Sequence, residues 1–125
     1  MYDSVITGIG IGCVFASNYA DSFRFYHELL ELSDVVTMNE HSCYFVINEK
    51  VGIYLIGGYQ LPARNPECVG TTFAFEVTSV QQMFNKMRDA GIQLLHSDLV
   101  QMTDIDFWFQ CLDPSGNIIE FIGKK

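Results

Sequence analysis

The side chain best placed to do chemistry is a carboxylate near the end of the chain. It belongs to residues 113–121, Asp-Pro-Ser-Gly-Asn-Ile-Ile-Glu-Phe, where Pro114 and Gly116 predict a tight turn. The residues after the turn alternate as a strand, so Glu120 shares a strand face with two isoleucines. Two interpretations are open: an exposed edge strand, or an apolar pocket in which the carboxylate contacts a ligand or acts as a general base.

The elements that must position this carboxylate follow an order that occurs twice. Residues 4–57 predict a strand, a helix from Asn18 to about residue 32, and three strands. Residues 58–69 contain glycines and prolines and predict a linker, after which residues 70–123 repeat the pattern. Two βαβββ modules of one α+β domain, residues 1–125, are therefore expected. The strands are predicted at about residues 4–15, 34–39, 42–48, 51–57, 71–77, 92–97, 104–112 and 117–122.

Composition excludes several classes of partner. The net charge is −8 with only seven Lys and Arg, so the basic surface needed for nucleic acid or an anionic membrane is missing. Neither a signal peptide nor an apolar run of about 20 residues is present, which predicts a cytoplasmic protein. The four cysteines form no CxxC pair and are expected to be reduced thiols packed among apolar side chains.

Two motifs resemble one known family. Residues 25–32, Phe-Tyr-His-Glu-Leu-Leu-Glu-Leu, resemble the FYxxxLGL stretch of the vicinal oxygen chelate superfamily, and residues 113–121 resemble its DPxGNxxE ending. This superfamily includes glyoxalase I, extradiol dioxygenases, methylmalonyl-CoA epimerase, fosfomycin-resistance transferases and bleomycin-resistance binding proteins. The resemblance implies two βαβββ modules that form a curved eight-stranded sheet of half-barrels. It also implies a homodimer, and leaves open whether the modules pair within one chain or between chains.

The resemblance also implies a divalent metal ion, but the matching positions lack its usual ligands. Three of the four positions fall on Ile11, Tyr54 and Thr72, with Gly10 or Gly12 replacing Ile11 if the register shifts by one. Only the fourth, Glu120, is a carboxylate, and a divalent site generally needs about three protein donors. The expectation is therefore no metal and no other cofactor. The three histidines are expected to be solvated or capping residues: His27, His41 and His96.

Together these observations favour a binding protein. The predicted function is metal-independent binding of an aromatic or antibiotic-like small molecule in the cavity between the modules. The alternative is an enzyme of this superfamily, a lyase, isomerase or dioxygenase, that uses displaced metal donors or Glu120 as a general base. The only tryptophan is expected at the ligand, because it alternates with Asp106 and Gln110 on a mixed face. The predicted ligand-binding residues are Ile11, Tyr54, Thr72, Trp108 and Glu120.

Overall fold

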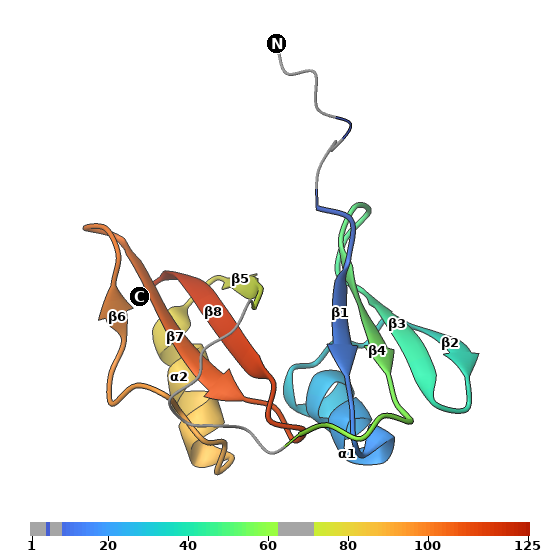
Figure 1. Ribbon diagram of the computed structural model, residues 1–125. Helices are drawn as coiled ribbons and strands as arrows, with labels where there is room; N and C mark the ends of the chain where they lie inside the picture. Colours follow the sequence, from blue (N-terminus) through green and yellow to red (C-terminus); the bar gives the residue numbers. More distant parts are fainter. Residues whose placement is uncertain (1–4, 6–8, 63–71) are drawn as a thin grey trace. The chain divides into compact units, whose positions relative to one another are not determined.

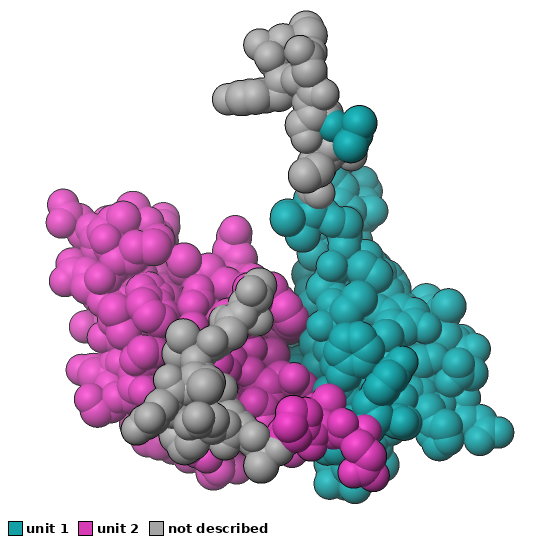
Figure 2. All heavy atoms as spheres, in the orientation of Figure 1, with its two compact units in different colours: residues 1–59 teal, residues 60–125 magenta. Residues whose placement is uncertain are grey.

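The computed structural model describes residue 5, residues 9–62 and residues 72–125. The chain divides into two compact units, residues 1–59 and residues 60–125 (Figure 2). In the described part of the chain, every helix is too short or too polar to cross a membrane.

Unit 1 is a four-stranded sheet with a helix on one face (Figure 1). The strand order is β1-β4-β3-β2, with β1 and β4 parallel and the other neighbours antiparallel. Tyr26 and Phe45 are fully buried between helix and sheet, with ring centroids 6.1 Å apart. The elements are β1 (Gly12–Phe15), α1 (Tyr19–Arg24), a π-helical turn η1 (Phe25–Leu29), β2 (Val35–Asn39), β3 (Ser42–Val46) and β4 (Gly52–Ile56).

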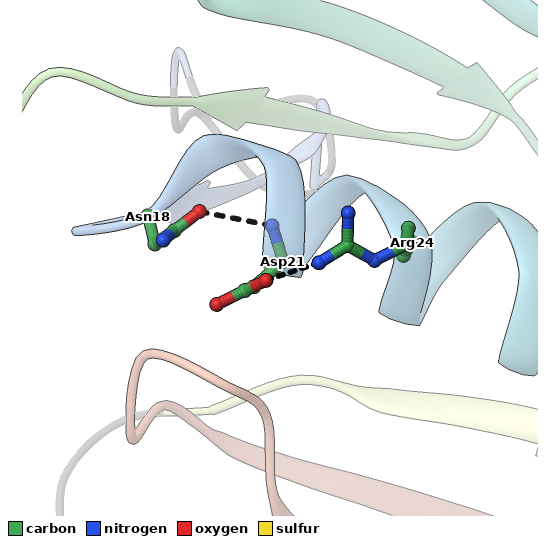
Figure 3. A network of polar contacts seen from close by, with 3 residues as sticks. All are labelled: Asn18, Asp21 and Arg24. Atoms are coloured by element: carbon green, nitrogen blue, oxygen red, sulfur yellow. Dashed lines mark hydrogen bonds and ion pairs between the residues drawn. The ribbon is translucent and has the colours of Figure 1, made fainter.

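Both ends of the first helix have identifiable causes. The Asn18 carboxamide oxygen accepts a hydrogen bond from the Asp21 backbone N–H at 3.0 Å, and Asp21 pairs with Arg24 one turn later (Figure 3). The last turn is wider than an α-helical turn, because the Leu30 N–H bonds to the carbonyl of Phe25. The helix ends at Leu29, about three residues earlier than predicted; the left-handed backbone of Glu31, with φ of 59°, does not continue it.

Unit 2 repeats this architecture with one helix on its sheet. The strand order is β5-β8-β7-β6, and β5 and β8 are parallel. Phe109 packs edge-on against Phe84 of the helix and stacks on Phe121, with centroid distances of 5.2 Å in both pairs. The elements are β5 (Ala74–Val77), α2 (Val80–Asp89), β6 (Val100–Gln101), β7 (Asp106–Leu112) and β8 (Ile118–Lys124).

The predicted α+β fold is confirmed, since both modules have the order βαβββ and each has four strands. Two predicted strands are wrong in extent. The first was expected over residues 4–15, but β1 covers only residues 12–15, and residues 4 and 6–8 lie outside the described part. The sixth was expected over residues 92–97. That segment forms only a single bridge, Leu94 to Cys111, and β6 lies further on, at residues 100–101.

The turn predicted before the last strand is present. Asp113 is 4% exposed, and its carboxylate accepts hydrogen bonds from the backbone N–H groups of Ser115 and Asn117 and from the Asn117 side chain, at 2.8–2.9 Å. Gly116 closes the turn with φ of 85° and donates its N–H to the Asp113 carbonyl. The turn therefore fixes where β8 begins, and with it which side of the sheet Glu120 occupies.

Candidate functional site

The two faces of the unit 2 sheet differ in what covers them. Alternate residues of β7 and β8, among them Phe109 and Phe121, are buried on the side of α2. The other alternate residues point away from α2 because side chains change sides at every step along a strand. We call this second side the open face of unit 2. By strand register it carries Thr72, Ala74, Glu76, Asp106, Trp108, Gln110, Leu112, Ile118, Glu120, Ile122 and Lys124.

Glu120 lies in the middle of the open face and is partly buried. Its register partners are Ala74 on β5 and Gln110 on β7. The Gln110 side-chain amide donates a hydrogen bond to the Glu120 carboxylate at 3.1 Å. The carboxylate is thus oriented by a neutral donor. Gln110 was not predicted as a site residue, although its alternation with Trp108 places it on this face.

Trp108 and Thr72 lie on the same face as Glu120. Trp108 faces Ile122 on β8, one register step from the pair of Gln110 and Glu120. The Thr72 hydroxyl donates to the carbonyl of Ile118, which ties the segment before β5 to the start of β8. Three of the predicted residues therefore share one sheet face. The Thr72 hydroxyl is already engaged by the backbone.

The other two predicted residues lie on the corresponding face of unit 1. Tyr54 faces Cys13 on β1 and Tyr44 on β3, on the side opposite the buried Val14 and Leu55. Ile11 precedes β1 with the same parity as Cys13 and is 46% exposed. Both side chains are therefore on the side of their own sheet that the helix does not cover.

The cysteines of the strands differ in exposure. Cys13 is exposed, whereas Cys43 and Cys111 are buried and none of these three forms a disulfide. Burial, with a smaller contribution from the nearby Asp113 carboxylate, raises the pKa of the Cys111 thiol to about 12. Burial also raises the pKa of Cys43, although a hydrogen bond from Tyr19 opposes this. Both buried thiols are thus protonated at neutral pH, and the fourth, Cys68, lies outside the described residues.

The histidines have three different surroundings. His27 Nδ1 lies 3.1 Å from the carbonyl oxygen of Leu32, at the end of the first helix. His41 is exposed in the turn between β2 and β3. His96 differs from the expectation of a solvated or capping residue: its Nε2 is buried with no hydrogen-bond partner among the described residues, and its ring packs edge-on against Trp108 at 5.0 Å.

Comparison with known proteins identifies the fold. No family model matches the sequence, and a search of curated proteins found no match either. Three solved structures illustrate the structural similarity. A glyoxalase/dioxygenase from Nostoc punctiforme has a TM-score of 0.79 at 18% identity, covering 100% of this chain and 96% of that chain. Lactoylglutathione lyase from Agrobacterium tumefaciens has a TM-score of 0.69 at 16% identity, covering 94% of both chains. Fosfomycin resistance protein FosX from Mesorhizobium loti has a TM-score of 0.70 at 11% identity, covering 97% of this chain and 95% of that chain.

This chain has the vicinal oxygen chelate fold. Identities this low establish the fold alone.

The sequence resemblance implies a divalent ion, which the side chains at the matching positions would have to hold. Ile11 has no donor atom, the Thr72 hydroxyl is bonded to the Ile118 carbonyl, and Glu120 is the only carboxylate among the four. Among the described residues, no three His, Cys, Asp or Glu side chains lie close enough together to hold one ion. The donor set at these positions does not fit the metal centre that the resemblance implies.

Proposed function

We propose that this protein binds a flat, aromatic or antibiotic-like small molecule without using a metal ion, and that Glu120 and Trp108 contact the ligand. The observation that carries the proposal is the open face of unit 2. It combines one aromatic ring, two isoleucines and a carboxylate whose hydrogen-bond partner is neutral. Apolar surface with a few fixed polar groups is the usual composition of a small-molecule site. The proposal extends to Ile11, Tyr54 and Thr72 as further contacts.

Glu120 is the residue to test first. A Glu120→Ala variant is expected to bind a flat aromatic ligand about tenfold more weakly, because a hydrogen bond to a charged group contributes about 1.5 kcal/mol. Binding is measured by isothermal titration calorimetry and by the fluorescence of Trp108, the only tryptophan. Glu49→Gln, in an exposed turn of unit 1, removes a carboxylate elsewhere and should leave affinity unchanged. Equal affinities of Glu120→Ala and the parent would remove Glu120 from the site.

Metal content separates binding from metal-dependent catalysis. Protein purified without chelators is expected to contain much less than one Zn, Ni, Mn or Fe per chain, because the matched positions supply one carboxylate where about three donors are needed. The measurement is elemental analysis by mass spectrometry. A near-stoichiometric ion that is lost in Glu120→Ala would overturn the metal-free proposal.

A second candidate function is catalysis with Glu120 as a general base. The observation in its favour is that the carboxylate is held by a neutral amide on a face with apolar neighbours, an arrangement able to accept a proton from a bound substrate. Several proteins of similar fold are described as lyases or glyoxalases. Turnover of a ligand that Glu120→Gln still binds but no longer converts would favour this function.

We also propose that the protein is a homodimer, to be checked by light scattering.

A further inference from the structure

An open hollow of about 580 Å³ lies at one end of the open face of unit 2. It is where β5 and β8 end and β7 begins, one register step beyond Trp108. Val77 and Gly123 contribute to its wall. Its lining side chains combine apolar surface with charges of both signs: Glu76, Thr78, Met102, Asp106, Ile122 and Lys124.

The charges of the hollow are not balanced. Asp106 and Lys124 face each other across β7 and β8, so this carboxylate has a cation on the neighbouring strand. The Asp106 carboxylate also accepts a hydrogen bond from the Thr103 hydroxyl at 3.0 Å. Glu76 instead faces Ile122. Within the described part of the chain, its carboxylate has neither an ion pair nor a hydrogen bond.

The open face as a whole carries a net negative charge, although Glu76 has one neighbour of each sign. Glu120 and Lys124 both lie diagonally across β5 and β8 from Glu76, on either side of Ile122, and the hydrogen-bond partner of Glu120 carries no charge. Three carboxylates and one ammonium group on one sheet face leave a formal charge of −2 (three negative, one positive). In the row that crosses the sheet at Glu76, the next side chains are Ile122 and Trp108. This row joins a free carboxylate to an apolar surface and an aromatic ring.

We propose that the hollow is a subsite for the positive charge of a protonated, nitrogen-containing aromatic ligand, with Glu76 as its counter-ion. The apolar body of that ligand would lie along Ile122 toward Trp108, where the indole ring also attracts a cation. The proposal rests on the proposed function and adds to it the charge of the ligand. A carboxylate or phosphate on the same body would be repelled by Glu76 and Glu120.

The test uses three ligands of one shape and different charge: proflavine, a cation at neutral pH, neutral acridone, and anionic acridine-9-carboxylate. Calorimetry in low salt should show tightest binding for proflavine. Glu76→Gln should weaken proflavine binding about fivefold, the upper range for an exposed charge pair, and leave acridone unchanged. Glu49→Gln makes the same change in net charge on unit 1 and should leave the affinity for both ligands unchanged.

The outcomes separate the two proposals. If all three compounds bind equally, or if Glu76→Gln binds proflavine as the parent does, the cation subsite is wrong while small-molecule binding stands. If Glu76→Gln and Glu49→Gln weaken proflavine binding equally, the effect comes from the net charge of the protein and the subsite is again wrong. If none of the three binds, the proposed function fails together with the subsite. Circular dichroism spectra of the variants should match that of the parent, since the Glu76 side chain is exposed.

Discussion

Replacement of Asp113 by alanine is expected to lower the free energy of unfolding by about 3–5 kcal/mol, the range for breaking a buried network around a charge. The carboxylate is buried and accepts three hydrogen bonds from the turn that follows it. Alanine would leave two backbone N–H groups and one amide without their acceptor. The turn also sets the start of β8, so its loss would disturb the pairing of β7 with β8.

Urea unfolding followed by Trp108 fluorescence measures this loss, because Trp108 is on β7 of the same unit. Asp98→Ala is the matched control, since that carboxylate is exposed and its described bond is to the adjacent Leu99 N–H. Asp113→Asn should lose an amount of unfolding free energy between those of the two alanine variants. Its amide oxygen can still accept from the backbone, but its NH₂ group would face the NH₂ group of Asn117. A loss below about 1 kcal/mol in Asp113→Ala would show that the network contributes little.

Features that depend on residues close together in the sequence were predictable. The turn at residues 113–117 depends on Asp113, Pro114 and Gly116, and the start of α2 depends on Ser79, whose hydroxyl accepts the Gln82 N–H at 3.2 Å. Alternation within each strand also grouped Trp108 with Gln110, and Glu120 with two isoleucines. These signals lie within a few neighbouring residues, so a single sequence was enough to identify them.

Features that depend on a distant partner were not predictable in the same way. The segment 92–97 has strand-like residues, but after one bridge to Cys111 the chain leaves β7, and the Asp98 side chain bonds to the next backbone N–H instead. The bond from Gln110 to Glu120 requires the register of β7 against β8, which the alternation of either strand alone does not fix. The position of Glu76 opposite Ile122 likewise depends on the register of β5 against β8.

Gly123→Ala is the other substitution with a large expected effect, a loss of about 2–4 kcal/mol in the free energy of unfolding, because a fixed backbone neighbour leaves no room for a methyl group. A Cβ at Gly123 would lie 2.2 Å from the carbonyl oxygen of Val77, its register partner on β5. Since the obstacle is backbone, no side-chain rotation relieves it, and β5 must move away from β8. That movement would also loosen the stack of Phe75 on Phe121, whose centroids lie 5.6 Å apart.

Gly123 also has a positive φ, of 157°, and two other glycines separate this cause from the close contact with Val77. Gly58 has φ of 85° but a Cβ there would meet nothing within 4 Å, so Gly58→Ala measures the cost of a positive φ alone, about 1 kcal/mol. Gly10→Ala meets neither obstacle and should leave stability unchanged. Because Val77 and Gly123 also border the hollow at Glu76, a displaced β5 should weaken proflavine binding in Gly123→Ala beyond the effect of Glu76→Gln. Equal stabilities of Gly123→Ala and Gly10→Ala would mean that β5 and β8 tolerate the added methyl group. The close approach of these two strands would then contribute little to the free energy of unfolding.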